Sequence, residues 1–317
     1  MEGRTIAKQK SYGGNKKSLW ERLKKQRYLQ MLALPGVLFM IVFNYIPLYG
    51  IIIAFKQYKV TRSISDSPWV GLKHFQELFA TEDFLNIIIN TLGISILNLL
   101  IAFPIAILFA ICLNELASKK FKKTVQTISY LPHFLSWTIL GGLLITWMGE
   151  SGLINEVLIK LGVLEQGVVF LGEPNYFWGI TLFSNIWKET GWSAIIYLAA
   201  IAGIDQELYE AAKVDGVSKL QKIKYITLPC ISGTIAIMFI LAVSGLLNAN
   251  FDQILILKNP LNAVRAEVFD TYVYRMGIGA GRFSYATAAG LFKSVISMIL
   301  LVSANKVSKK LTGNSLY

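Results

Sequence analysis

The residues best suited to act on another molecule lie at positions 210–229, in a polar stretch between two long apolar runs. Glu210 and Asp215 supply carboxylates that suit ion pairs with a basic protein surface. Ala211 and Ala212 have small side chains that permit close docking. Carboxylates beside small side chains indicate a surface that binds another protein. On local rules alone, an ordinary connector between two helices is the alternative.

A second pair of ionisable residues, Lys188 and Glu189, falls near the middle of an apolar run. Charged side chains at such a depth in a membrane are costly unless they face a bundle interior or a water-filled cavity. Adjacent helical residues do not share a face, so we expect the two side chains to have different partners. A role in a transport pathway and a structural role both stay open.

Signs of catalysis or cofactor binding are sparse. The chain contains no G-x-x-x-x-G-K-[ST] phosphate-binding loop, so we expect it to bind no nucleotide by that route. Cys112 and Cys230 have no ligand spacing around them, and we predict no metal site. An intramembrane hydrolase would need a nucleophile and a base, for which Ser244 and His133 are available. Ala242 occupies the leading position of a G-x-S-G motif, and we predict that the chain is not an enzyme.

The composition indicates an integral membrane protein. Of 317 residues, 54% are hydrophobic and 16% are charged, against about 25% charged in soluble domains. Six apolar runs are long enough for a helix of roughly 20 residues to cross the bilayer. These predicted spans are 29–55, 84–113, 125–148, 176–203, 229–250 and 284–305. The sequence therefore predicts an all-α protein with six transmembrane helices.

Lysine and arginine set the expected orientation, because cationic segments stay in the cytoplasm. The segments 1–28, 114–124, 204–228 and 306–317 together carry more than twice as many of them as 56–83, 149–175 and 251–283. We therefore expect both termini inside, a basic tail at 1–28, an outer loop at 56–83, a core of five spans at 84–305 and a second tail at 306–317. The net charge of +12 then reflects anionic headgroups at the inner face, and we expect no nucleic-acid partner.

Within the first tail, Leu19, Trp20 and Leu23 lie among lysines and arginines. This pattern predicts a helix on the inner leaflet, with a solvated tail as the alternative.

Helix signals divide the cytoplasmic loop 205–229 into two short helices. Asp205 is a suitable N-cap for a helix over 206–214, and Gly216 can adopt the left-handed conformation that ends it. Ser218 followed by Gln221 forms a capping-box pattern for the second helix. We predict two short helices that meet at a glycine corner.

The loop carries Glu-Ala-Ala, three residues, Gly, nine residues and Ile-x-Leu-Pro, and it resembles the EAA loop of ABC importer permeases. The matching residues are Glu210, Ala211, Ala212, Gly216, Ile226, Leu228 and Pro229. Other segments resemble the LplB-like branch of carbohydrate permeases, which takes up oligosaccharides and polysaccharide fragments. They are 47–58, 69–75, 90–91, 114–115, 126–137, 199–203, 251–254, 270–275 and 288–293.

The resemblance implies a type I importer in a bacterial inner membrane. This permease would pair with a second, different permease, two ATPase subunits that bind ATP and Mg, and an extracellular solute-binding protein that delivers an oligosaccharide. The EAA loop would couple ATP hydrolysis to alternating access. The residues expected to couple to the ATPase are Glu210, Ala211, Ala212, Asp215, Gly216, Ile226, Leu228 and Pro229.

Sugar recognition combines aromatic faces with amides, as in mixed apolar and polar ligand pockets. The candidates for a substrate pathway are Trp137, Trp147, Asn185, Trp187, Lys188, Glu189, Tyr197, Asn248 and Asn250. For the aromatic residues, interfacial anchoring or bundle packing is the alternative. A self-contained secondary transporter is the alternative function, although it would normally need more spans and leaves the 210–229 pattern unexplained.

The outer loops 56–83 and 251–283 are the expected docking surfaces for the binding protein. The second loop, with a turn at Asn259 and Pro260, either dips toward the pathway or packs on the rim. Its basic residues Arg265, Arg275 and Arg282 suit a uronate-containing oligosaccharide, or equally an acidic binding protein.

Overall fold

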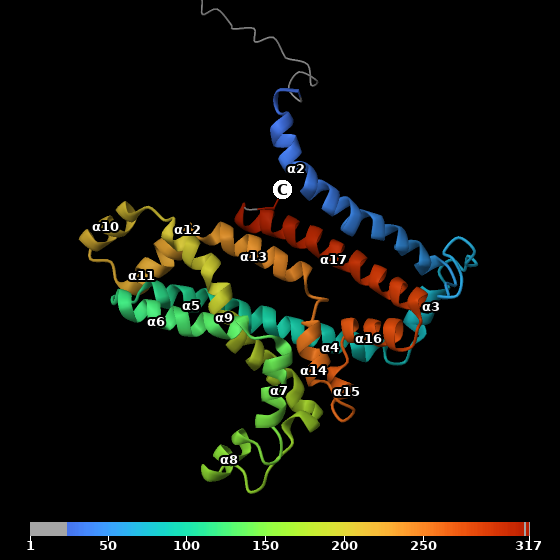
Figure 1. The fold of residues 1–317 in the computed structure, drawn as a ribbon. Coiled ribbons are helices and arrows are strands. Elements are labelled where there is room, and N and C mark those ends of the chain that lie inside the picture. The colour runs from blue at the N-terminus through green and yellow to red at the C-terminus, as the bar shows by residue number, and fades with distance from the viewer. Residues whose placement is uncertain (1–23, 314, 317) are drawn as a thin grey trace, which may run out of the picture. The chain divides into compact units, whose positions relative to one another are not determined.

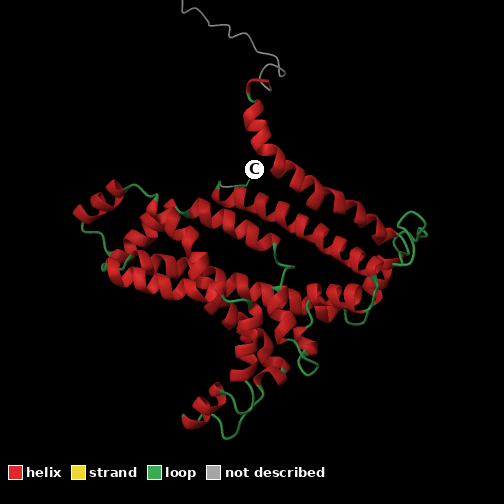
Figure 2. Ribbon diagram, in the orientation of Figure 1, coloured by secondary structure: helices red, strands yellow, loops and turns green. Residues whose placement is uncertain are grey.

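The computed structural model describes residues 24–313 and 315–316, and Leu19, Trp20 and Leu23 of the predicted tail helix lie outside them. The chain divides into two compact units, Met1–Ile52 and Ile53–Tyr317. Helices form all the regular elements of the described residues, as Figure 2 shows. The all-α prediction is confirmed for this part of the chain.

The first apolar run forms one long helical segment, Arg27–Phe55, which is long and apolar enough to cross a membrane. It begins as α2 (Arg27–Met40), passes through a π-helical turn at Ile41–Tyr45 and ends in a 3₁₀ stretch at Ile46–Phe55. Most side chains of α2 are exposed in the isolated chain, as expected for a helix that faces lipid or another subunit.

Two further helical segments of the second unit meet the same criterion of length and apolarity. One is Phe84–Asn114, built from α4 (Phe84–Leu97), a π-helical turn at Asn98–Ala102 and α5 (Phe103–Asn114). The other is Phe283–Lys310, within α17 (Phe283–Thr312). The fourth predicted span is α9 (Phe177–Ala202), whose 26 residues correspond to about 39 Å of helix.

Two bends, which the sequence did not indicate, lie within the third predicted span, 125–148, and at the start of the fifth, 229–250. Lys119–Phe134 and Trp137–Trp147 meet at 95°, and Lys219–Cys230 and Ser232–Ser244 meet at 64°. The first break follows a 3₁₀ turn that contains Pro132, and Ser136 then caps α7 (Trp137–Trp147) by accepting a hydrogen bond from the Ile139 amide at 3.2 Å. Counting each bent pair as one span brings the segments that meet the criterion of length and apolarity to five among the described residues, and α9 is not one of them.

The remaining helices are shorter and are labelled in Figure 1. They include α3 (Lys73–Ala80), α6 (Lys119–Tyr130), α8 (Leu153–Lys160), α10 (Gln206–Val214), α11 (Lys219–Lys222), α12 (Leu228–Cys230), α13 (Ser232–Ser244), α14 (Phe251–Leu257), α15 (Ala263–Ala266) and α16 (Phe269–Tyr274). Short 3₁₀ turns occupy Leu131–Phe134, Phe170–Gly172 and Pro174–Tyr176, and π-helical turns occupy Ile223–Thr227 and Arg275–Gly279.

The predicted outer loop at 251–283 is largely helical and well packed, which the sequence did not indicate. Ile254, Leu257 and Val268 are almost fully buried and join one hydrophobic cluster with residues of α4, α7 and α9. The turn expected at Asn259 and Pro260 is present, and the Asn259 side chain accepts the Leu261 amide at 2.9 Å. Tertiary burial thus makes this segment part of the bundle.

Close helix packing holds the second unit together. α9 packs against both α5 and α6, and α13 runs beside α17 (Figure 1). Where α6 crosses α9, a Cβ atom added at Gly191 would lie 2.1 Å from the Ser129 carbonyl oxygen. A small residue at this position permits the close backbone approach that is typical of membrane helix pairs.

Candidate functional site

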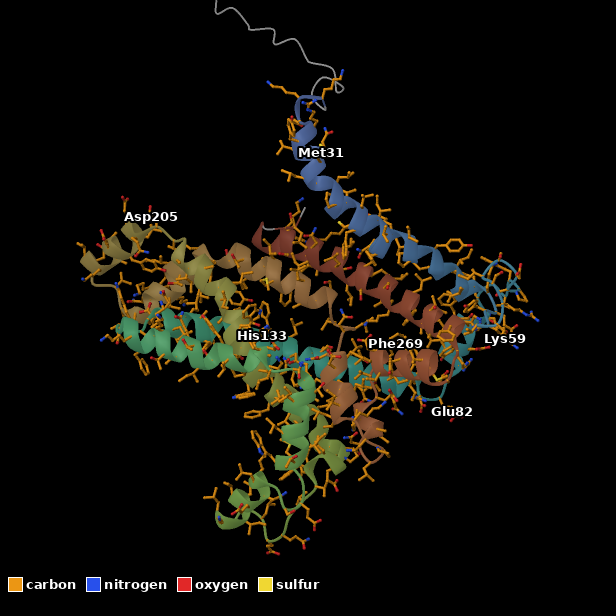
Figure 3. All side chains as sticks on the ribbon, in the orientation of Figure 1. Met31, Lys59, Glu82, His133, Asp205 and Phe269 are labelled. Carbon is orange, nitrogen blue, oxygen red and sulfur yellow. The ribbon has the colours of Figure 1, made fainter. Side chains whose placement is uncertain are left out.

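The local prediction for the loop 205–229 is confirmed at its helix ends. Asp205, labelled in Figure 3, caps α10 by accepting a hydrogen bond from the Glu207 amide at 3.0 Å. Gly216 follows the C-cap of α10 and has the left-handed conformation, with φ +68°, that ends the helix. The Ser218 amide donates to the Gln221 side chain at 3.0 Å, which completes the capping box that starts α11. We call the segment 205–230 the hairpin.

The second helix of the hairpin begins after Ser218 and runs past Leu228 to Cys230. α11 continues through the π-helical turn Ile223–Thr227 into α12 (Leu228–Cys230), so Pro229 lies near the end of this helical segment. The direction changes only after Cys230, where the 64° bend leads into α13. The sequence predicted that Pro229 starts the fifth span. This prediction is wrong, because Pro229 belongs to the helical segment before the bend.

The coupling candidates divide into an exposed group and a packed group. Glu210, Ala211, Asp215, Gly216 and Pro229 are exposed and can meet a partner. Ala212, Ile226 and Leu228 pack inward: Ala212 is buried, and the other two lie against the hydrophobic cluster of α5 and α9. Ala212 nevertheless lines a groove of the hairpin together with Ile226, so its role in docking stays a prediction.

The hairpin has two arms, α10 and the helical segment Lys219–Cys230. A groove of about 340 Å³ lies between them. Its walls include Leu208 and Ala211 on α10, Asp215 and Val217 at the corner, and Tyr225 on the second arm. Val214 beside it is 88% exposed. Apolar side chains, an exposed carboxylate and a rigid turn together form a surface suited to another protein.

The second feature is a cavity of about 390 Å³ between α4, α5, α9, α13 and the turn that follows α13. Five candidates for the substrate pathway line it: Asn185, Glu189, Tyr197, Asn248 and Asn250. Because α13 ends at Ser244, Asn248 and Asn250 lie in a turn, although the sequence placed them in a helix.

Asn250 has φ +31° and is the one non-glycine residue with positive φ in the described part of the chain. Asparagine tolerates this region better than most residues. A strained polar residue at the wall of a cavity is a frequent mark of a functional site.

An amide pair crosses this cavity wall. Asn185 on α9 donates from Nδ2 to Oδ1 of Asn98 at 2.8 Å, and Asn98 itself donates to the Ile94 carbonyl at 2.9 Å. Asn98 begins the π-helical turn inside the second span, and π-bulges are often found at functional sites. Asn98 was not among the predicted residues of the pathway, although an asparagine in the middle of the 84–113 run was a usable signal.

Lys188 and Glu189 share a partner, contrary to the expectation that they would diverge. Lys188 is 4% exposed and donates from Nζ to the His133 carbonyl at 2.6 Å. Glu189 approaches the Nδ1 atom of His133 to 2.7 Å, and its other oxygen lies 3.3 Å from the Lys188 Nζ. The lysine thus holds the chain at the bend after His133, whereas Glu189 reaches the cavity.

A second cavity of about 540 Å³ lies at this bend. Trp137, Lys188 and Glu189 line it together with Asp252 of α14, so the 251–283 segment does approach the interior. The Lys188 ammonium lies 5.6 Å from the centre of the Trp137 ring, within reach of a cation–π contact. Trp147 and Trp187 are exposed and line neither cavity, so the structure does not bring these two candidates into either lining.

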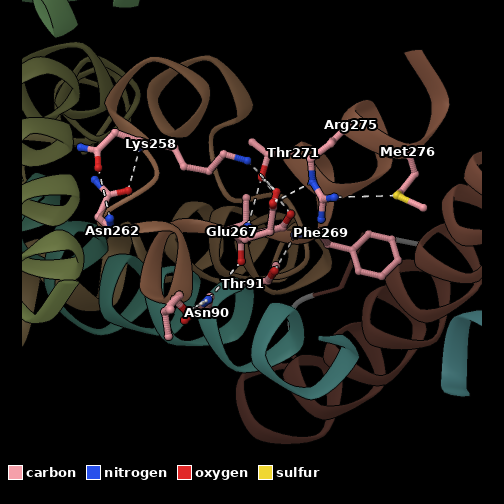
Figure 4. A network of polar contacts seen from close by, with 12 residues as sticks. Asn90, Thr91, Lys258, Asn262, Glu267, Phe269, Thr271, Arg275 and Met276 are labelled. Atoms are coloured by element: carbon pink, nitrogen blue, oxygen red, sulfur yellow. Dashed lines mark hydrogen bonds and ion pairs between the residues drawn. The ribbon is translucent and has the colours of Figure 1, made fainter. Parts of the chain in front are cut away.

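A polar network fixes the segment that follows α14 onto α4 (Figure 4). The Asn90 amide donates to the carbonyls of Val264 and Glu267 at 2.9 and 3.1 Å. The Glu267 carboxylate in turn accepts from Lys258 at 2.9 Å and from Arg275 at 3.1 Å. Asn90 is buried, so its loss would leave two carbonyls without this partner.

The three arginines named as uronate candidates have intrachain contacts. Arg275 pairs with Glu267, and Arg282 pairs with Glu77 at 2.6 Å. Arg265 lies over the Trp178 ring at 5.3 Å. Arg275 and Arg282 therefore each have an acidic partner within the chain, and Arg275 shares its partner Glu267 with Lys258.

Residues 102–313 match the family described as binding-protein-dependent transport system inner membrane component. The chain is 43% identical over 303 residues to the polygalacturonan/rhamnogalacturonan transport system permease protein YteP of Bacillus subtilis (strain 168), covering 95% of this chain and 94% of YteP. It is 40% identical over 296 residues to Protein LplB of the same organism, covering 93% and 92%.

The fold also matches a solved transporter. A chain in the crystal structure of a bacterial alginate ABC transporter, in complex with an alginate pentasaccharide-bound periplasmic protein, superposes with a TM-score of 0.86. It is 40% identical, and the match covers 94% of this chain and 99% of that chain. The family match spans more than half of the sequence, and these relatives match it nearly end to end. The chain therefore belongs to the binding-protein-dependent transport system inner membrane components, the permeases of ABC importers.

Proposed function

We propose that this permease works in a bacterial inner membrane as one half of a transport pathway for acidic oligosaccharides. The observation that carries the proposal is the near full-length similarity to a polygalacturonan/rhamnogalacturonan permease and to an alginate transporter. Galacturonan and alginate are both polymers of uronic acids. A cavity that combines amides with Tyr197 agrees with a sugar ligand, because amides bind hydroxyl groups and rings cover the apolar faces of sugars.

The chain would move sugar without hydrolysing ATP itself. In its hairpin Glu210, Asp215 and Gly216 are exposed, and Asp215 lines a groove that can receive side chains of another protein. We assign this surface to an ATPase partner, of which the transporter would hold two copies, each binding ATP and Mg. A second, different permease would complete the pathway, and a solute-binding protein would deliver the substrate from outside.

The exposed faces of the helices agree with an assembly in lipid. Leu32, Phe39 and Phe43 of the first apolar segment are each more than half exposed in the isolated chain. Apolar exposure of this extent is stable only against lipid or a partner subunit.

Reconstitution tests the proposal. Proteoliposomes that contain both permeases and the ATPase, with the binding protein added outside, should accumulate oligogalacturonate or oligomannuronate only when ATP is supplied on the ATPase side. A neutral malto-oligosaccharide of equal length is the matched control and should not be accumulated. ATP-independent uptake would instead support a secondary transporter, and equal uptake of the neutral sugar would refute the acidic substrate class.

A further inference from the structure

An ion pair joins the hairpin to the end of the α5 helix. Lys222 of α11 approaches the carboxylate of Glu115 to 3.1 Å, although the two residues are 107 positions apart. Their side chains are 27% and 19% exposed, so the pair is largely shielded from solvent. Shielding strengthens the attraction between unlike charges and makes an unpaired charge at the same place more costly.

Lys222 also connects the two arms of the hairpin. Its ammonium lies 5.6 Å from the centre of the Tyr209 ring on α10. The Tyr209 hydroxyl is 3.0 Å from the hydroxyl of Thr227, which is buried at the end of the second arm. A displacement of either arm would therefore change the contacts of the Lys222 side chain.

The α5 helix leads from Glu115 to the cavity. Glu115 follows its last residue and donates its backbone N–H to the Ile111 carbonyl at 3.1 Å. Phe103 and Ala106, in the first turns of the same helix, line the 390 Å³ cavity. A helix of 12 residues is about 18 Å long and moves as one body over this distance.

Apolar packing also links these elements, since α5, α9 and the second arm share a hydrophobic cluster. Such packing is non-directional and permits small sliding of one helix over another. A charge-assisted contact has a defined length and partner, so it can fix the register between hairpin and helix.

We propose that Glu115 and Lys222 are positioning residues that transmit movement of the hairpin to α5 and so to the cavity wall. The inference rests on the proposed coupling role of the hairpin and adds the route by which the movement reaches the interior. Neither residue belongs to the exposed surface assigned to the ATPase.

The test uses the complete transporter in proteoliposomes and measures ATP hydrolysis with and without the binding protein. Glu115→Gln and Lys222→Gln each remove one charge, and the double variant Glu115→Lys with Lys222→Glu reverses the pair. Lys120→Gln is the matched control, because Lys120 is exposed on α6 and no ion pair involves it among the described residues. ATPase co-purification and thermal unfolding are measured for every variant.

We expect each single variant to retain the ATPase but to lose roughly 2- to 10-fold of the stimulation by the binding protein, the size of effect expected for residues on a coupling route. The reversed pair should recover at least half of the wild-type stimulation, and Lys120→Gln should match wild type. Wild-type stimulation in both single variants would overturn the inference, and so would a reversed pair that stays as defective as the single variants although its unfolding temperature is normal.

Two further readouts keep the result decisive. If Glu115→Gln does not assemble, Glu115→Asp keeps the charge on a shorter side chain and should show an intermediate loss. If the wild-type transporter neither retains an ATPase nor responds to the binding protein, the proposed function itself fails. That outcome differs from a coupled wild type whose Glu115 and Lys222 variants behave normally.

Discussion

The Nδ1 atom of His133 lies 2.7 Å from a carboxylate oxygen of Glu189, and the imidazole ring stacks on Trp192 with 4.3 Å between ring centres. His133 lies in the 3₁₀ turn Leu131–Phe134 that precedes the 95° bend, while Glu189 and Trp192 lie on α9. Lys188 adds a hydrogen bond to the carbonyl of the same histidine. This group of side chains therefore fastens the bent third span onto the fourth span.

Glu189→Gln should destabilise the permease, because the buried Lys188 would lose its nearest negative charge. We expect a loss of about 2 kcal/mol in the free energy of unfolding, somewhat below the range for fully buried pairs because Glu189 is 29% exposed. Thermal unfolding in detergent measures it. Adding Lys188→Met should recover part of the loss, since the orphaned charge is then removed. Equal stability of Glu189→Gln and wild type would contradict this account.

Gly216→Val should impair coupling, because a β-branched residue is strained at φ +68°. The site has open space around it, so the penalty is conformational and should be about 1–2 kcal/mol. Gly216→Asn is the matched control, as asparagine tolerates this conformation and should keep most activity. Transport and ATPase stimulation by the binding protein, measured together in proteoliposomes, distinguish the two variants. Equal activity of the valine and asparagine variants would argue against a required corner.

Gly191→Ala should destabilise the contact between α6 and α9. The new methyl group would lie 2.1 Å from the Ser129 carbonyl oxygen, which belongs to the backbone and cannot rotate away. We expect a loss of about 1–3 kcal/mol, as for overpacking. Gly179→Ala on the same helix has no atom within 4 Å of its new methyl group and should be neutral or stabilising by up to about 1 kcal/mol. The order of their unfolding temperatures tests the packing directly.

Asn185→Ala should raise the KM for sugar uptake, because the side chain lines the cavity and forms the amide pair with Asn98. One lost hydrogen bond to a substrate hydroxyl corresponds to about 1 kcal/mol, or roughly a fivefold change. Trp187→Phe is the control, since Trp187 lies on α9 outside both cavities. Uptake kinetics at fixed binding-protein concentration give the comparison. An unchanged KM for Asn185→Ala would remove this residue from the pathway.

Local signals allowed the helix ends at the corner of the hairpin to be predicted, although the place of Pro229 was predicted wrongly. Asp205, Ser218 and Gly216 act within a few positions of the helix ends that they define, so their effect is readable without tertiary information. The 95° bend was missed because the apolar run around it is continuous, although Pro132 and Ser136 carried the signal. Hydrophobicity alone does not separate a straight span from a bent one.

The shared partner of Lys188 and Glu189 was beyond reach of the sequence. Helix geometry correctly separates adjacent side chains, but long side chains of neighbouring residues can still converge on one residue of another helix. The helices at 251–283 were missed for a related reason. They are short and are stabilised by burial against α4, α7 and α9. The local sequence pattern of a short helix does not reveal this stabilisation by tertiary packing.

Cysteine crosslinking tests the central claim that the hairpin contacts an ATPase. The two native cysteines, Cys112 and Cys230, are exposed and are first replaced by serine. Val214→Cys then places a thiol at a position of α10 whose side chain is 88% exposed, and Leu161→Cys places the control thiol at an exposed position in the predicted outer loop 149–175. The account predicts an adduct with the ATPase subunit from position 214 and none from position 161. An adduct only from position 161, or a transporter that couples ATP to uptake without any adduct from position 214, would contradict it.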